Sequence, residues 1–313
     1  MIETLSSKVG NTPLFTISTD DCGGGIFAKC EWTNPTGTVK DRAAISMIAD
    51  AVRRYSSLDE ARDKLHILEY SGGSLAFSIA RFCKELQLRN TLVVSSGMGT
   101  AACEELRILG STVVVCPKEL GFLAVMSKAR ELAASDPSLT FLYQHENQAN
   151  YIAHRDGTAV EILRQLDNAP ISAWIASVGT GASLMGVGSR LKAESSLTQI
   201  HAVLPAELPY GSPQPPNGLR KLAGSGGLGN GLKQTFVKRK EQDVHRFWNI
   251  PWSAAAEEMI SIYKQFEFRI GSSAAANLLV AKNVYSSLGL GHTVVTIFPS
   301  AGSQEEWEAV HKI

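Results

Sequence analysis

Short apolar runs rich in β-branched residues alternate with helix-like segments along most of the chain. An apolar run of roughly four to eight residues between turn residues predicts a buried strand, and apolar residues three and four apart predict a helix. Strands that alternate with helices predict an α/β fold of mostly parallel sheets, covered by helices on both faces. We expect strands at 25–30, 65–69, 91–95, 112–116, 174–178, 200–204 and 293–298, and helices at 41–55, 74–86, 100–109, 122–134, 152–166, 183–191, 254–266 and 273–288.

Residues 206–233 break this pattern. They are rich in proline and glycine, notably at 213–216 and 224–227, and show no periodicity. A segment of this length inside a folded domain is typical of a functional loop rather than a linker. The length of 313 residues, at roughly 150 residues for each domain, indicates two domains.

The charge balance argues against two classes of partner. The chain has 30 basic and 30 acidic side chains, which leaves no basic footprint for nucleic acid and no polybasic segment for a membrane surface. No apolar run approaches the roughly 18 residues of a membrane span. Residues 1–5 also lack the features of a signal peptide. We therefore expect a cytoplasmic protein.

The cysteines do not indicate a cross-linked or metal-binding protein. They are odd in number and show no Cys-x-x-Cys spacing, which argues against a disulfide framework and a zinc site. We expect free, buried or half-buried thiols and no metal. The five residues are Cys22, Cys30, Cys83, Cys103 and Cys116.

The most informative stretch is residues 35–42, Pro-Thr-Gly-Thr-Val-Lys-Asp-Arg. Lys40 ends a Gly/Thr turn, and a helix-like run follows it directly. This placement holds one amine rigidly, where it can form an imine with a carbonyl cofactor such as pyridoxal phosphate.

Three polar turns follow predicted strands, where ligands gather in an open α/β sheet. Residues 179–186, Gly-Thr-Gly-Ala-Ser-Leu-Met-Gly, open a helix and predict a phosphate site, with an ordinary turn as the alternative. Residues 69–74, Glu-Tyr-Ser-Gly-Gly-Ser, can bind a carboxylate or form a helix start capped by Ser71 or Ser74. Residues 298–303 place Ser300 where it can face a ring nitrogen, although Pro-Ser-x-Gly is also common turn chemistry.

A fourth polar run, residues 144–150, reads Gln-His-Glu-Asn-Gln-Ala-Asn. It is either a catalytic loop or a solvated connection. A histidine on a polar loop is usually neither a ligand nor a base, so His145 is not expected to take a direct part.

Taken in order, these motifs resemble those of the pyridoxal-phosphate enzymes of the cysteine synthase and cystathionine β-synthase family, which have the tryptophan synthase β-like fold, fold type II. Each motif alone is weak, but their order and spacing hold over nearly the whole chain. The resemblance is carried by residues 9–14 (Val-Gly-Asn-Thr-Pro-Leu), 34–42, 144–150 with 153–154, 179–183 and 271–275 (Gly-Ser-Ser-Ala-Ala).

The resemblance implies two three-layer αβα domains. Residues 1–38 and 146–313 would form a large cofactor-binding domain, and residues 39–145 a smaller, mobile substrate-loop domain. Lys40 would form the Schiff base with the cofactor, and Ser300, or Ala301 beside it, would lie near the pyridine nitrogen. The phosphate would be held by Gly179, Thr180, Gly181, Ala182 and Ser183, and the substrate carboxylate by Ser71, Gly72, Gly73, Ser74 and Gln144.

The substrate loop departs from the family pattern. The usual Thr-Ser-Gly-Asn-Thr-Gly falls on residues 71–76, so that Ser74 replaces the Asn that contacts the cofactor and Leu75 replaces the following Thr. A shift of one residue would put Gly73 at the Asn position. In both alignments the amide is missing, which indicates a specialised relative. Ala182 replaces a usual Gly, a mild change because backbone N–H groups bind the phosphate.

The resemblance implies a homodimer that carries out β-replacement on O-acetylserine, O-phosphoserine or serine through an aminoacrylate. The product would be cysteine or a β-substituted alanine, in primary or specialised metabolism. The alternative enzyme is an α,β-eliminating one, of the serine/threonine dehydratase or cysteine desulfhydrase type.

Two other classes compete with these enzymes. Lys40 argues against a non-catalytic relative, and the lack of a P-loop or a full Gly-x-Gly-x-x-Gly argues against a nucleotide-binding module. We expect neither an N-terminal haem segment nor a C-terminal regulatory domain, and so no allosterically controlled cystathionine synthesis.

Overall fold

Two units make up the part of the chain that this computed structural model describes, residues 1–310. Unit 1 comprises Met1–Val9 and Lys40–Asn150, and unit 2 comprises Gly10–Val39 and the chain from Tyr151 onward. The boundary between the units at Val39 and Lys40 separates the turn of the lysine motif from the lysine itself.

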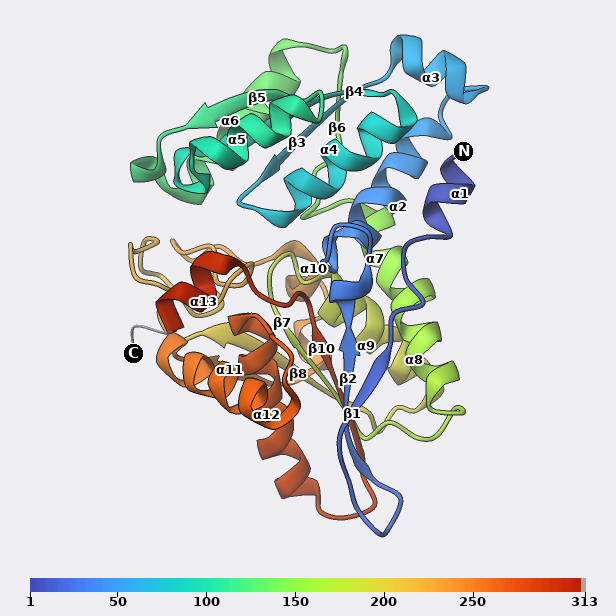
Figure 1. The fold of residues 1–313 in the computed structure, drawn as a ribbon, viewed down its shortest axis with the longest axis vertical. Coiled ribbons are helices and arrows are strands. Elements are labelled where there is room, and N and C mark those ends of the chain that lie inside the picture. Colours follow the sequence, from blue (N-terminus) through green and yellow to red (C-terminus); the bar gives the residue numbers. More distant parts are fainter. Residues whose placement is uncertain (311–313) are drawn as a thin grey trace. The chain divides into compact units, whose positions relative to one another are not determined.

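Unit 1 is built on a four-stranded parallel sheet with the order β5-β4-β3-β6 (Figure 1). The strands are β3 (His66–Ser71), β4 (Arg89–Ser95), β5 (Thr112–Cys116) and β6 (Leu139–Phe141). The helices are α1 (Ile2–Ser6), α2 (Lys40–Val52), α3 (Leu58–Lys64), α4 (Ser74–Leu86), α5 (Thr100–Ile108) and α6 (Gly121–Ser135), with 3₁₀ turns η2 (Ser96–Met98) and η3 (Lys118–Leu120).

Helices cover both faces of this sheet. Ile67 of β3 belongs to the core built with α2, α4 and α5, whereas the ring of Tyr70 contacts Phe122 of α6. Successive residues of a strand point to opposite faces, so these contacts place α6 on the face opposite α4. Unit 1 therefore has three layers.

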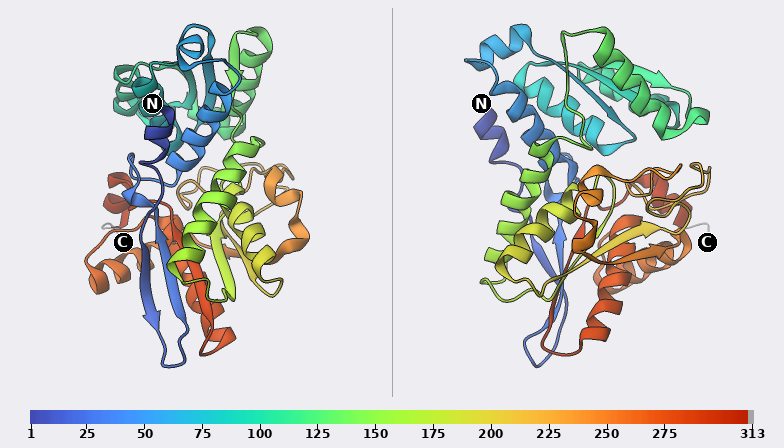
Figure 2. Two further views of the ribbon diagram at one scale, coloured as in Figure 1. Left: turned by 90° about the vertical axis from the view of Figure 1, so that its right-hand side faces the viewer. Right: turned by 180° about the vertical axis from the view of Figure 1, so that it is seen from behind.

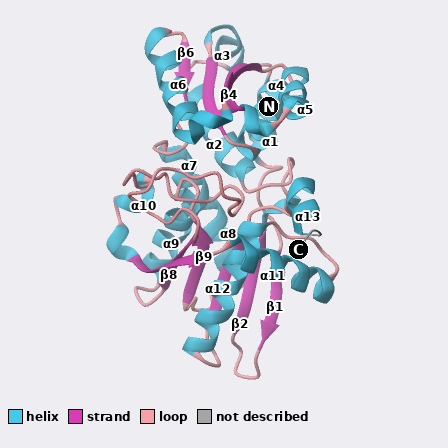
Figure 3. Ribbon diagram, turned by 90° about the vertical axis from the view of Figure 1, so that its left-hand side faces the viewer, coloured by secondary structure: helices cyan, strands magenta, loops and turns pink. Residues whose placement is uncertain are grey.

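Unit 2 is built on a six-stranded sheet with the order β1-β2-β10-β7-β8-β9, whose strands are magenta in Figure 3. β1 runs antiparallel to β2 and the other pairs are parallel. The strands are β1 (Leu14–Thr19), β2 (Gly25–Cys30), β7 (Ala173–Ser177), β8 (Gln199–Pro205), β9 (Val244–Ile250) and β10 (Thr293–Phe298).

Helices cover both faces of the sheet in unit 2 (Figure 2), and a separate core lies on each face. Ala173 and Ile175 of β7 pack in one core with α11 and α12, and the alternating Trp174 and Ala176 pack in the other with α8, α9 and α10. The helices are α8 (Ala159–Gln165), α9 (Ala182–Glu194), α10 (Thr235–Lys238), α11 (Trp252–Phe266), α12 (Ser272–Leu288) and α13 (Gln304–Val310), with η1 (Glu31–Thr33), the π-helix η4 (Ala153–Thr158) and η5 (Glu241–Asp243). α7 (Gln148–Ile152) crosses the boundary between the units.

The predicted elements are confirmed, with small shifts at their ends. Predictions for 25–30, 112–116, 293–298 and 74–86 match β2, β5, β10 and α4 residue for residue. The helix predicted at 152–166 is instead the π-helix η4 followed by α8. The segment 206–233 contains no helix or strand, as predicted.

The strands that the prediction missed, β1, β6 and β9, all lie at sheet edges. An edge strand has a neighbour on one side only, and its residues are less buried than those of a central strand. The burial of β9 shows this, since its residues are half-buried or exposed. The short helices α1, α3, α10 and α13 were also missed, because a periodic pattern needs more residues than they contain.

We predict that Gly186→Ala destabilises the protein by up to about 2 kcal/mol. A Cβ at Gly186 of α9 would lie 2.7 Å from the backbone oxygen of Tyr151 and 2.9 Å from the Cβ of His154. Such overpacking costs roughly 1–3 kcal/mol, which exceeds the gain of about 1 kcal/mol in helix propensity. Urea unfolding measures the change. Gly218→Ala is the control, because no atom lies within 4 Å of a Cβ there, and equal stability of both variants would contradict the prediction.

Candidate active site

The residues predicted to bind ligands follow the carboxyl ends of parallel strands in both units. In unit 2, residues 179–183 follow β7 and Ser300 follows the adjacent strand β10. In unit 1, residues 71–74 end β3, and Gln144 follows the adjacent strand β6. Because parallel strands end at the same sheet edge, each unit brings its own predicted residues together.

The loop at residues 179–183 of unit 2 has the chemistry of a phosphate site. Gly181 has a φ of 87° and is the N-cap of α9, and no side chain caps that helix. A Cβ at Gly181 would lie 2.6 Å from Cγ2 of Val237, so a residue with a side chain does not fit at this position. The hydroxyl of Thr180 accepts a hydrogen bond from Ala182 N at 3.2 Å, which shapes the turn. Backbone N–H groups at a helix N-terminus bind phosphate, so the loop fits the phosphate of pyridoxal phosphate.

The turn at Ser300 is joined to the lysine motif within unit 2. Val39 N donates a hydrogen bond to Pro299 O at 2.9 Å, and Thr38 forms an isolated antiparallel bridge with Ser300. The hydroxyl of Ser300 accepts a hydrogen bond from Gly302 N at 3.3 Å. The backbone that leads to Lys40 is therefore fixed beside the residue predicted to face the pyridine nitrogen.

Lys40 is the first residue of α2, and its side chain is half-buried. Burial lowers the pKa of its amine. A lower pKa leaves a larger fraction of the amine neutral near pH 7, and the neutral amine is the form that attacks a carbonyl or accepts a proton.

The turn at residues 71–74 of unit 1 is held by its own serine. The hydroxyl of Ser71 accepts hydrogen bonds from Gly73 N at 3.0 Å and from Ala76 N at 3.2 Å. Gly73 is the N-cap of α4, whose first residue is Ser74, and as a glycine it has no side chain of its own that could cap the helix. Of the two predicted capping residues, Ser71 therefore caps the start of α4. Gly72 and Ser74 are exposed.

Gln144 is buried and is tied to the strand that carries this turn. Its backbone N donates to Glu69 Oε2 at 3.2 Å, and its side-chain amide donates to Tyr70 O at 3.0 Å. Tyr143 before it has a φ of 55°, which is uncommon for a residue with a side chain. In this run Gln144, His145 and Asn150 are buried, whereas Glu146 and Gln148 are exposed.

Two groups that the sequence interpretation did not assign to the site lie beside it in unit 1. The hydroxyl of Tyr70 forms a hydrogen bond of 2.5 Å with Nδ1 of His145, and the two rings are stacked. Burial, with smaller effects from Lys40 and Arg130, lowers the pKa of His145 to about 3. His145 is therefore neutral at physiological pH.

Glu69 is the second such group. Its side chain is fully buried, and its Oε1 has no hydrogen-bond partner among residues 1–310. Burial raises its pKa to about 8, although hydrogen bonds from backbone N–H groups act in the opposite direction. Glu69 is therefore mostly protonated at pH 7. A charged residue at the end of an apolar strand was the sequence signal that could have identified it.

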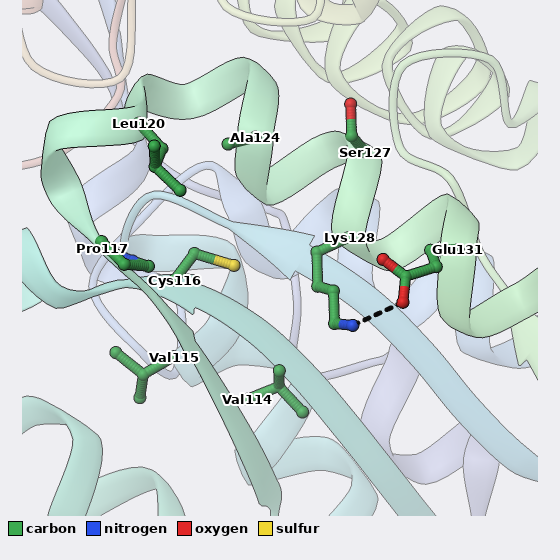
Figure 4. A pocket seen from close by; sticks show the side chains of 9 residues that line it. All are labelled: Val114, Val115, Cys116, Pro117, Leu120, Ala124, Ser127, Lys128 and Glu131. Carbon is green, nitrogen blue, oxygen red and sulfur yellow. Dashed lines mark hydrogen bonds and ion pairs between the residues drawn. The ribbon is translucent and has the colours of Figure 1, made fainter.

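An open groove of about 350 Å³ lies elsewhere in unit 1, between β5 and α6 (Figure 4). Val115 and Leu120 line it and are well exposed. Lys128 and Glu131 form an ion pair at its edge at 2.6 Å. None of the residues predicted to bind ligands lines this groove.

Within the described chain, no cluster of three or more His, Cys, Asp or Glu side chains has the arrangement of a metal site. The cysteines are free thiols, of which Cys22 is exposed and the others are buried. Among residues 1–310, no helix combines the length and the apolar character that crossing a membrane requires.

We predict that the stability of Glu69→Gln relative to wild type increases as pH rises from 5 to 8. The carboxyl group has a pKa of about 8 in the folded state, against an ordinary value of 4.5. Unfolding then releases a proton between these values, so the wild type loses stability as pH rises through this window, and glutamine cannot. We expect a relative gain of about 2 kcal/mol or more, from roughly 1.4 kcal/mol for each pKa unit.

Urea unfolding at pH 5 and pH 8 measures this change. Glu60→Gln is the control: hydrogen bonds to its side chain, that of Lys64 above all, lower the pKa of Glu60 to about 2, below this window. A difference between Glu69→Gln and wild type that does not change with pH would show that Glu69 is ionised in the folded state.

Known proteins are similar to this chain in sequence and in fold. The profile of the family described as "Pyridoxal-phosphate dependent enzyme" matches residues 5–300. Cysteine synthase B of Campylobacter jejuni is 34% identical over 207 residues, which cover 66% of this chain and 67% of that protein. Cysteine synthase of Staphylococcus aureus is 29% identical over 306 residues, which cover 97% and 95%.

A solved structure, O-acetylserine sulfhydrylase isoform 3 of Entamoeba histolytica, matches with a TM-score of 0.84 at 23% identity, over 99% of this chain and 91% of that one. These matches confirm the resemblance and the α/β fold of type II. The chain belongs to the pyridoxal-phosphate-dependent enzymes, within the family of the cysteine synthases.

Proposed function

We propose that this chain catalyses β-replacement on an activated serine, in which a small nucleophile replaces the group on Cβ. The observation that carries the proposal is the pairing of Thr38 and Val39 with Pro299 and Ser300, which fixes the backbone directly before Lys40 at the carboxyl end of β10. Relatives named cysteine synthase support it.

The larger unit binds the cofactor in this proposal. Backbone N–H groups at the N-terminus of α9, with Thr180 and Ser183, hold the phosphate, and Gly181 lets the backbone approach it closely. When bound, pyridoxal phosphate acts as an electron sink that stabilises negative charge at Cα of the amino acid. Lys40 would hold the cofactor covalently until the amino group of the substrate takes its place, and the freed amine would then take up the Cα proton, for which its lowered pKa is suited.

The turn of unit 1 binds the substrate carboxylate. Backbone N–H groups at the start of α4 and the amide of Gln144 are neutral donors, and Glu69 and His145 beside them are uncharged at pH 7. An anion there meets no negative charge from Glu69. Ser74 stands at the position of the family's Asn, so the main chain rather than a side-chain amide takes most of this role.

The hydroxyl of Ser300 favours elimination from Cβ over transamination. A neutral hydroxyl does not keep the ring nitrogen protonated as an aspartate would, so the ring withdraws electrons less strongly. The Cα proton moves to Lys40, the bond from Cβ to oxygen breaks, and acetate, phosphate or water leaves. A thiol or sulfide sulfur then bonds to Cβ, and a proton returns to Cα.

We propose a cytoplasmic homodimer whose smaller unit moves when substrate binds. The partners are an amino acid and a small nucleophile.

Products decide between replacement and the alternative, α,β-elimination. The cofactor-loaded enzyme is given O-acetylserine, O-phosphoserine or serine, each with and without sulfide, and products are identified by mass spectrometry. We expect cysteine in the presence of sulfide, and less pyruvate and ammonia than without it, because sulfide bonds to Cβ before the eliminated product can be released and hydrolysed by water at Cα. Pyruvate and ammonia that are unchanged by sulfide, with no cysteine, would identify an eliminating enzyme instead.

We predict that Lys40→Ala abolishes covalent attachment of the cofactor and lowers turnover by several orders of magnitude, because it removes the attached amine and the proton acceptor. Intact-protein mass spectrometry after borohydride reduction detects the attachment. Lys84→Ala, at an exposed lysine of α4, is the control and should keep both. Attachment at full yield in Lys40→Ala would assign the role to another lysine.

A further inference from the structure

The Pro/Gly-rich segment of unit 2 is anchored at the carboxyl edge of the sheet. Leu222 is buried in the core formed with α11 and α12. Next to it, Ala223 N donates a hydrogen bond to the hydroxyl of Ser272 at 2.9 Å. Gly226 N donates to Val178 O at 3.0 Å, and Val178 directly precedes the phosphate loop. The segment between these contacts is therefore a fixed part of the edge where ligands bind.

Lys221 is held on this anchored segment. Cδ and Cε of its side chain lie 3.7 and 3.8 Å from the position that a Cβ of Gly226 would occupy. The side chain is half-buried, and no ion pair of 4.0 Å or less involves it among residues 1–310. Burial lowers its pKa, against a smaller opposite effect of Glu207. A partly desolvated cation without a paired anion costs stability, which is the usual mark of a binding residue.

The other cations of this segment are engaged with partners of their own. The guanidinium of Arg220 lies 5.3 Å from the ring centre of Trp252 and 3.9 Å from Glu305. Lys233 pairs with Glu241 at 2.8 Å. Glu207 accepts a hydrogen bond from Trp252 N through Oε1 at 2.8 Å, while its Oε2 is buried without a partner among the described residues. Lys221 thus remains the cation of this segment that can receive an outside anion.

We propose that Lys221 binds an oxyanion carried by the leaving group or by the nucleophile. This inference rests on the proposed function, in which the cofactor phosphate is bound by residues 179–183 and the substrate carboxylate by unit 1. The cofactor phosphate and the substrate carboxylate then each have their own hydrogen-bond donors. The anion that Lys221 binds is therefore a different group of the substrate or of the nucleophile. A phosphate leaving group and a carboxylate on a thiol share this chemistry, and experiment separates them.

The test compares Lys221→Gln with wild type in matched reactions of the cofactor-loaded enzyme. O-phosphoserine and O-acetylserine differ in the charge of the leaving group. Mercaptoacetate and 2-mercaptoethanol differ in the charge of the nucleophile. Lys221→Arg should restore binding because it keeps the charge, and Lys240→Gln, at an exposed lysine of the same unit, controls for loss of any positive charge.

We expect Lys221→Gln to lower kcat/KM by about tenfold or more for the charged member of one pair and by less than about threefold for its neutral counterpart, as for the loss of one charge-assisted hydrogen bond. A loss with O-phosphoserine, whichever nucleophile is used, identifies the leaving group. A loss with mercaptoacetate, whichever leaving group is used, identifies the nucleophile. Equal losses within both pairs would overturn the inference.

Two further measurements keep this inference separate from the proposed function. Calorimetry of the cofactor-loaded enzyme measures binding of inorganic phosphate, the leaving group of O-phosphoserine, and of mercaptoacetate without turnover, and we expect weaker binding of one of them by Lys221→Gln. If wild type and variant bind both equally, the inference is wrong even when the replacement reaction occurs. A reduced affinity of the variant for pyridoxal phosphate itself, with unchanged discrimination within the pairs, would assign Lys221 to the cofactor and also overturn it.

Discussion

One hydrogen bond, from Val39 N to Pro299 O, fixes the point on which the chemistry depends, because the next residue is Lys40. An amine at the end of a flexible chain would have to be positioned anew in each cycle, at a cost in rate. The turn before it is held from behind by Asn34. The amide of Asn34 donates to Glu31 Oε2 at 2.8 Å and to Thr38 O at 3.2 Å, and its oxygen accepts from Gly10 N at 2.9 Å.

This network continues into the core of unit 2. Glu31 also accepts a hydrogen bond from Thr12 at 2.7 Å, and the backbone oxygen of Thr12 accepts one from the fully buried Lys29 at 2.6 Å. Lys29 is paired with Glu161 at 2.7 Å, so its charge is compensated. A buried polar network that is fully satisfied holds one geometry and strongly disfavours others. The motif at residues 9–14 and the lysine motif at residues 34–42 are therefore joined by one hydrogen-bond network.

The sequence predicted the central elements and the ligand-binding turns, because both are encoded locally. Buried strands such as β10 are continuous apolar runs, and the turn at residues 179–183 carries its own glycines and hydroxyls. The edge strand β9 (Val-His-Arg-Phe-Trp-Asn-Ile) is not a continuous apolar run and could not be predicted in this way, whereas the edge strand β5 (Thr-Val-Val-Val-Cys) is such a run and was predicted. The roles of Glu69 and of the pair Tyr70 and His145 were missed for another reason. These residues join segments about 75 positions apart, and nothing in either segment alone indicates the other.

The same distant contacts explain how the substrate turn can lack the family's amide. The turn is supported from behind by rings: Cε2 of Phe122 lies 3.5 Å from the position that a Cβ of Gly72 would occupy, and Tyr70 stacks on His145. Such a turn presents its N–H groups at fixed positions without help from the side chain at residue 74. In the proposed function, recognition of the carboxylate depends on the main chain, which a substitution leaves in place. What Ser74 changes in that proposal is the contact with the cofactor and with the rest of the substrate, and that is where the specificity of this chain should differ from that of its relatives.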